Sequence, residues 1–195
     1  MKRSIGFALL LSFVLFAAPV SSSAAAAEPA KAAPKAPAMK GFRAEFLAQL
    51  KDVEEKLTSL AEAVPAEKFS WRPAEGVRSV GEAYVHVAAG TYFILGFLGV
   101  KAPEGTGLTM EKDITEKKDV VAALKKSMDH ARKAVTSMSD ADLDKALKLF
   151  GQDTTYRGTL LLLSNHMHEH LGQSIAYARM VGVVPPWSRS EGKGN

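Results

Sequence analysis

The sequence contains no cysteine, so this chain of 195 residues forms no disulfide and cannot be lipidated on a cysteine. Its folded part must therefore be stabilised by packing alone. The chain also lacks a large excess of either charge, because its formal net charge is +4 and the lysines are interspersed with acidic residues. This distribution forms no basic stripe and argues against nucleic acid as a partner. No segment shows a convincing alternation of polar and apolar residues, so no strand is predicted.

The first 27 residues have the three parts of a secretory signal peptide. Lys2 and Arg3 precede an apolar run over residues 5–20, and only small residues occupy positions 21–27. This order predicts cleavage and export to the periplasm or the extracellular space. A retained membrane anchor is the alternative, because the run is close to spanning length. The small-residue region favours cleavage, which would leave no membrane span in the mature protein.

The remainder of the chain divides into a linker, one domain and a tail. Residues 28–38 read EPAKAAPKAPA, a composition that predicts a disordered linker. Residues 39–186 are long enough for a single domain with one core. Residues 187–195 are mostly polar and are expected to form a flexible tail.

Four long patterns within the domain each predict a helix. Apolar residues recur every three or four positions in the first of them, and Pro65 ends it. Ser79 and Glu82 have the spacing of a capping box at the start of the second. The predicted helices cover residues 39–63, 79–98, 115–138 and 155–181. They predict an all-α four-helix bundle, a fold in which facing helices build metal sites.

Three of the five histidines lie in apolar helical segments. His166 and His170 belong to LLLLSNHMHEHLGQ, and residues four apart on a helix differ by only about 40° around its axis. They therefore share a face, whereas His168 points about 200° away from His166. Two imidazoles one turn apart can bind a single cation. His86, in the second predicted helix, is the candidate for a third ligand, and His130 and His168 are expected at the periphery.

Each of these residues also has a plainer interpretation. A single histidine in an apolar helix, such as His86, is more often a packed core residue than a ligand, so the histidines of the bundle could simply pack. Gln173 lies one turn after His170 and either orients a ligand or a bound water, or packs as a polar cap. Glu82 lies one turn before His86 and either accepts a hydrogen bond from it or is occupied by the capping box. The capping box is slightly favoured.

Two sequence blocks resemble the DinB superfamily of metal-binding four-helix bundles. FSWRPAEGVRSVGEAYVHV resembles the family's W-x-P…R-S-x-G-E…H block, and NHMHEHLGQ resembles its N-H-x-x-x-H-x-G-Q block. The resemblance implies metal ligands at His86, His166 and His170, the same residues that helix geometry selects. It departs from the family at Glu169, where many members have the first of two adjacent histidines. The second of that pair is the ligand, so the three-histidine set is retained.

Such a site would leave open positions on a divalent cation, as catalytic sites do. Nitrogen ligands favour Zn²⁺ or Ni²⁺, with Fe²⁺ and Mn²⁺ as further candidates. The resemblance implies a metal-dependent hydrolase or a thiol S-transferase acting on a small molecule, although export argues against intracellular thiol cofactors. The alternative is a non-catalytic metal- or ligand-binding module of an envelope stress response. No residue stands out as a general acid or base.

The second predicted helix has apolar residues all round, including Tyr92 and Phe93. Such a helix is compatible with a homodimer.

Overall fold

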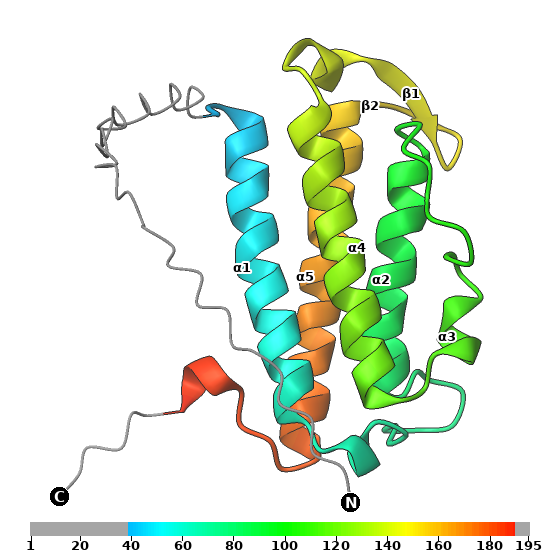
Figure 1. Ribbon diagram of the computed structural model, residues 1–195, viewed down its shortest axis with the longest axis vertical. Helices are drawn as coiled ribbons and strands as arrows, with labels where there is room; N and C mark the ends of the chain where they lie inside the picture. The colour runs from blue at the N-terminus through cyan, green and yellow to red at the C-terminus, as the bar shows by residue number, and fades with distance from the viewer. Residues whose placement is uncertain (1–38, 190–195) are drawn as a thin grey trace, which may run out of the picture. The chain divides into compact units, whose positions relative to one another are not determined.

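The computed structural model describes residues 39–189, and within this part four long helices pack side by side (Figure 1). They are α1 (Phe42–Ala63), α2 (Val80–Gly96), α4 (Lys117–Ser137) and α5 (Tyr156–Met180). Each boundary lies within three residues of its predicted position. The prediction of a four-helix bundle is therefore confirmed. Short 3₁₀ turns at Ala66–Lys68, Ala141–Asp144 and Pro186–Ser188 lie in the connections and after α5.

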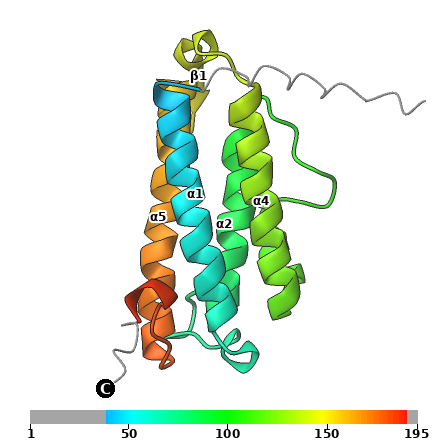
Figure 2. The ribbon, with the colours of Figure 1, turned by 60° about the vertical axis from the view of Figure 1, so that its left-hand side comes forward.

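The order of the helices around the bundle differs from the order along the chain. Both α1 and α2 pack against α4 and α5, so α1 and α2 occupy opposite corners (Figure 2). Neighbours α2 and α4 run in the same direction (Figure 1). The chain between them therefore returns along the side of the bundle. This return, residues 97–116, contains the short helix α3 (Met110–Asp113) and is called the crossover below.

The core is built from the apolar faces of the four helices. The apolar stripe predicted on α1 is buried except for its first member, Phe42, which is partly buried; the buried members are Phe46, Leu50, Val53, Leu57 and Leu60. Leu124 of α4 and Leu160 and Leu163 of α5 are likewise fully buried. Each such side chain contributes about 1.5–3 kcal/mol when it leaves water. Packing of this extent accounts for a domain that has no disulfide.

The start of α2 is fixed by the predicted capping box. The Ser79 hydroxyl accepts a hydrogen bond from the backbone N–H of Glu82, and the Glu82 carboxylate accepts one from the backbone N–H of Ser79 at 2.7 Å. An N-cap of this kind stabilises a helix by about 1 kcal/mol. It also fixes the position of His86, which lies two turns further along α2.

The expectation that the chain has no strands is wrong for one hairpin. Strands β1 (Ala146–Leu149) and β2 (Gln152–Thr155) pair antiparallel, with Leu149 opposite Gln152. The two turn residues, Phe150 and Gly151, have φ values of 50° and 82°. A two-residue hairpin requires such left-handed conformations because their twist matches that of the strands. Strands of four residues that face mostly solvent are too short to show a clear alternation.

The remaining predictions about chain organisation concern other residues. The signal peptide at residues 1–27 and the linker at residues 28–38 lie outside the described residues, as does most of the predicted tail. Across residues 39–189, none of the helices combines the length and the apolar character that crossing a membrane requires.

Candidate metal centre

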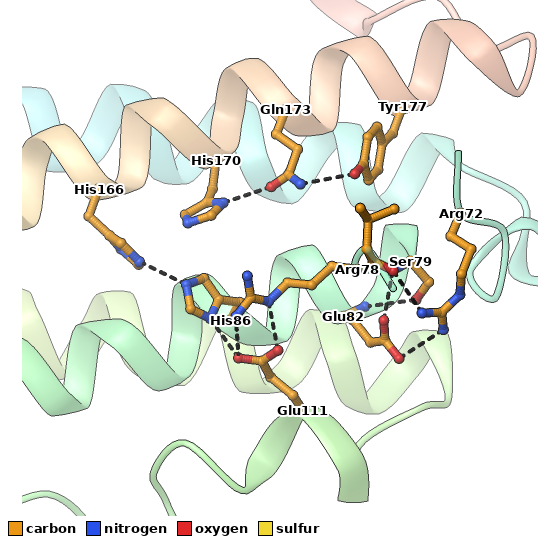
Figure 3. Close-up of polar contacts among 11 residues, drawn as sticks. Arg72, Arg78, Ser79, Glu82, His86, Glu111, His166, His170, Gln173 and Tyr177 are labelled. Carbon is orange, nitrogen blue, oxygen red and sulfur yellow. Dashed lines mark hydrogen bonds and ion pairs between the residues drawn. The ribbon is translucent and has the colours of Figure 1, made fainter. Parts of the chain in front are cut away.

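The three histidines selected from the sequence meet between α2 and α5 (Figure 3). Their ring centroids are 5.1 Å apart for His86 and His166, 4.6 Å for His86 and His170, and 4.7 Å for His166 and His170. Each ring offers one nitrogen to a group of three in which all separations are within 4.8 Å. The predicted convergence of imidazoles from two helices is therefore confirmed.

The spacing of these nitrogens suits a cation. The Nε2 atoms of His86 and His166 are 3.3 Å apart. Two imidazole nitrogens that share a zinc ion at about 2.0–2.1 Å in tetrahedral geometry are separated by roughly 3.3–3.4 Å. The separation of the two Nε2 atoms in the structure matches that value.

The other nitrogen of His86 is held by a carboxylate from the crossover. Nδ1 of His86 lies 2.6 Å from Oε1 of Glu111, and the Arg78 guanidinium binds the two oxygens of the same carboxylate at 2.7 and 3.3 Å. An ionised carboxylate can only accept, so the proton of the imidazole lies on Nδ1 and the lone pair of Nε2 is available to a cation. This carboxylate–histidine arrangement is typical of metal ligands.

The ring of His170 is oriented in the same way by Gln173. Nδ1 of His170 donates to Oε1 of Gln173 at 2.7 Å, and the Gln173 amide nitrogen donates to the Tyr177 hydroxyl at 3.0 Å. The chain of bonds along α5 fixes both the amide and the imidazole (Figure 3). Of the two interpretations of Gln173, the structure supports the one in which it orients a histidine.

The ring of His166 is positioned by packing rather than by a hydrogen-bond acceptor. Its Nδ1 is buried and has no hydrogen-bond partner among residues 39–189. The ring lies directly over Gly90 of α2, where an added Cβ would approach Cε1 to 2.4 Å. The close approach of the two helices at this level therefore requires glycine at position 90.

The electrostatics keep the rings of His166 and His86 neutral. Burial, together with the neighbouring His170 and His86, lowers the pKa of His166 to about 4. Burial also lowers the pKa of His86 below its usual value, although the hydrogen bond to Glu111 partly opposes this. Burial acts to raise the pKa of Glu111, but hydrogen bonds from Arg78 and His86 outweigh it and lower that pKa overall. At neutral pH the imidazoles of His86 and His166 are thus uncharged and the Glu111 carboxylate is ionised, the protonation states that metal binding needs.

Of the two interpretations of Glu82, the structure supports the favoured one, in which its carboxylate belongs to the capping box. The carboxylate of Glu82 is occupied by the backbone N–H of Ser79 and by Arg72 at 3.0 Å, which is the capping-box alternative. Glu111 makes the contact with His86 instead. Nothing in the sequence marks Glu111, because it lies in a charged segment of the crossover whose path is set by the tertiary fold.

The two remaining histidines take no part in the cluster. Nδ1 of His168 donates to the Ser164 carbonyl at 2.8 Å on its own helix, as expected for a residue that points away. His130 is less peripheral than expected, since its ring packs 5.1 Å from that of Tyr92 and its Nε2 is buried. It lies on α4, which carries none of the three clustered histidines.

A hollow lies beside the residues that orient His86 and His170. An open hollow of about 440 Å³ is lined by Arg78, Glu111, Gln173 and Tyr177. These are the same side chains that hold His86 and His170. A small molecule entering there would meet a guanidinium, an amide and a phenol next to the histidines.

Comparison with known proteins gives one family match. The model of the DinB superfamily matches residues 49–174, a span that includes all three histidines. No curated protein sequence matches the chain.

Solved structures share the fold. A DinB-like protein from Bacillus cereus ATCC 10987 aligns with 24% identity and a TM-score of 0.65, over 72% of this chain and 93% of that one. A member of the DinB family from Exiguobacterium sibiricum aligns with 19% identity and a TM-score of 0.57, over 74% and 95% of the two chains. YfiT from Bacillus subtilis, described as a probable metal-dependent hydrolase with an unusual four-helix bundle topology, aligns with 14% identity and a TM-score of 0.57, over 77% and 94%.

Proposed function

Since the chain belongs to the DinB superfamily, as its two sequence blocks predicted, we propose that it binds a divalent metal through His86, His166 and His170. The observation that carries this proposal is the convergence of three imidazoles, two of which have their Nδ1 atoms held by Glu111 and Gln173. Bonds of this kind leave the Nε2 lone pairs of both rings available to a cation, and the ligand nitrogens of the three histidines lie within 4.8 Å of one another. A cluster of histidines that merely packed would not need them.

Zn²⁺ or Ni²⁺ suits an all-imidazole site best, and Fe²⁺ and Mn²⁺ are the further candidates. A divalent cation with three protein ligands keeps an open position and makes bound water acidic or polarises a carbonyl group. Around it, Glu111 holds the proton on Nδ1 of His86, and Gln173 does the same for His170. Arg78 pairs with the Glu111 carboxylate, which holds that carboxylate in place and offsets its charge.

We propose metal-dependent hydrolysis of a small molecule as the reaction. The support is the open site, the hollow next to it and the description of the structurally similar YfiT as a probable metal-dependent hydrolase. Transfer to a thiol at the same site is the competing reaction. A module that binds metal or a small ligand without turnover is the alternative function.

We further propose that the protein acts outside the cytoplasm, because its first 27 residues have the order of a secretory signal peptide. The partner would then be a small molecule of the periplasm or the extracellular medium. A homodimer that packs through the exposed Phe93 of α2 is the alternative to a monomer in solution.

Metal content tests the proposed site. Protein purified without an affinity tag is expected to contain close to one divalent ion per chain, and His86→Ala, His166→Ala and His170→Ala are each expected to lose it. His168→Ala is the matched control, because this histidine lies on the same helix but points away. If the three variants bind metal as well as the parent does, the proposed site is wrong. A screen of ester, amide and thiol-transfer substrates with metal-loaded protein then separates hydrolysis, transfer and binding alone.

A further inference from the structure

A second hollow lies between α2 and the crossover, on the other side of the histidines from Arg78. It has a volume of about 400 Å³ and is lined by Tyr92, Phe93 and Gly96 of α2 and by Phe97, Ala102 and Gly107 of the crossover, among others. Its lining is mainly apolar. Pockets for small molecules typically have volumes of about 300–1,000 Å³ and predominantly apolar walls.

We infer that this hollow binds the apolar end of the substrate whose reacting group lies at the three histidines. This inference rests on the proposed function and narrows the substrate class to small amphiphilic molecules. Such a molecule carries an aromatic or alkyl group about 10 Å from the bond that reacts, since seven helical residues at about 1.5 Å each separate His86 from Phe93.

The geometry of α2 connects the hollow to the metal centre. Phe93 follows His86 by seven residues on α2, so the two side chains lie within about 20° of each other around the helix axis, and Phe97 follows directly after the last residue of the helix. The crossover follows the same side of α2, with Ala102 and Gly107 at the hollow and Glu111 at His86. One face of one helix and one connection therefore line both sites.

Exposed aromatic rings continue this surface to the hairpin. Phe93 is 42% exposed and Phe150 is 64% exposed, and their ring centroids are 6.2 Å apart. Phe150 also contacts Phe97, at 5.3 Å between centroids. Its φ of 50° is left-handed, a conformation that Asn or Gly adopts with less strain in this kind of turn. A phenylalanine that gains little burial at such a position is better explained by contact with a bound ligand than by stability of the turn.

The volume of the hollow, about 400 Å³, suits a small-molecule group. An added Cβ at Gly96 or Gly107 would meet no atom within 4 Å, so the absence of side chains at these positions leaves the space open. An inserted phenyl or alkyl group can fill such a space. A second copy of the chain packing against the exposed rings is the competing occupant.

A glycine substitution tests the hollow without touching the metal ligands. Gly96→Leu places a side chain into the open space at the end of α2, and Gly172→Leu, on α5, adds the same side chain where an added Cβ also meets nothing within 4 Å. With metal removed by EDTA, the apolar dye anilinonaphthalene sulfonate is expected to bind at least tenfold more weakly to Gly96→Leu and unchanged to Gly172→Leu. Equal binding by the parent and both variants overturns the inference.

Two hydroxamates then test the connection to the metal centre. Acetohydroxamate can contact only the metal, whereas phenylhexanohydroxamate can also reach the hollow. Burial of a phenyl group predicts about ten- to hundredfold tighter binding of the second compound to the metal-loaded parent. Gly96→Leu should abolish this preference and leave acetohydroxamate binding unchanged.

The outcomes separate the two proposals. If the dye binds as expected but neither hydroxamate binds, the metal site fails and the apolar pocket remains. If acetohydroxamate binds and the parent shows no preference for the phenyl compound, the proposed function remains and this inference fails. If dye binding decreases as the protein dimerises, the occupant is a second copy, and the inference is again overturned.

Discussion

Substituting Gly90 by alanine should displace one metal ligand without changing any ligand. The added Cβ would lie 2.4 Å from Cε1 and 2.9 Å from Nε2 of His166. Carbon atoms in contact prefer separations of about 3.5–4.0 Å, so the imidazole must move by roughly 1 Å. Metal–ligand distances tolerate only about 0.2 Å, and the moved ring would therefore no longer bind the cation. We expect the metal affinity to fall about 100-fold, as for loss of a ligand, which corresponds to roughly 3 kcal/mol.

The stability of the metal-free protein should change much less than its metal affinity. Alanine in a helix interior is favoured over glycine by roughly 0.5–1 kcal/mol, which offsets part of the strain of about 1–3 kcal/mol from overpacking. Gly172→Ala is the control, because it makes the same change on α5 where an added Cβ meets no atom within 4 Å. It should stabilise the protein slightly and leave metal affinity unchanged.

Isothermal titration with Zn²⁺ and with Ni²⁺ measures both affinities, and circular dichroism checks that each variant is folded. The reasoning is refuted if folded Gly90→Ala binds metal as tightly as the parent. His166 would then either not be a ligand or not depend on the close approach of α2.

Three further predictions follow from the same geometry. Glu111→Ala removes the hydrogen-bond acceptor of His86 and should weaken metal binding about ten- to hundredfold. Glu82→Ala removes only the capping carboxylate, so it should lower stability by about 1 kcal/mol and leave the metal affinity unchanged. Equal metal affinities for the two variants would contradict the assigned roles. Because the pKa of His166 is lowered from 6.5 to about 4, the unfolded chain binds more protons than the folded one between these pH values. Metal-free protein should therefore lose stability as the pH falls through that range. The melting temperature of His166→Gln should depend less on pH, and an identical pH dependence in the parent and the variant would exclude the effect. Phe150→Asn relieves roughly 1 kcal/mol of backbone strain at a left-handed position and loses an aromatic contact of similar energy. The melting temperature of the variant should therefore stay within about 2 °C of the parent's. A clear decrease would show that Phe150 mainly stabilises the hairpin.

Much of this site could be predicted from the sequence because its key features are local or periodic. The apolar spacing of three and four predicts the helices, and the four-residue spacing of His166 and His170 predicts their common face. The apolar surroundings of His86 then suggest that it joins them inside the bundle. The capping box at Ser79 and Glu82 is equally local, and the structure contains it as predicted.

The features that escaped prediction depend on contacts between distant parts of the chain. Glu111 contacts His86 across 25 positions in sequence, from a four-residue helix in a segment rich in charges. Gly90 is one small residue among several in α2, and only the position of His166 on α5 shows why it is needed. Neither residue has a spacing or a composition that distinguishes it from its neighbours before the chain is folded.

The direction of α4 explains why these distant contacts gather at one place. In a bundle whose sequential helices are antiparallel neighbours, short loops at the ends suffice, and no connection covers a helix face. Here α2 and α4 are parallel neighbours, so the crossover must return along the bundle beside α2 (Figure 1). That return brings Glu111 to Nδ1 of His86 and supplies Ala102 and Gly107 to the apolar hollow. The same change of connectivity thus provides both the acceptor that orients a metal ligand and one wall of the proposed substrate pocket, which is why the site cannot be understood from the helices alone.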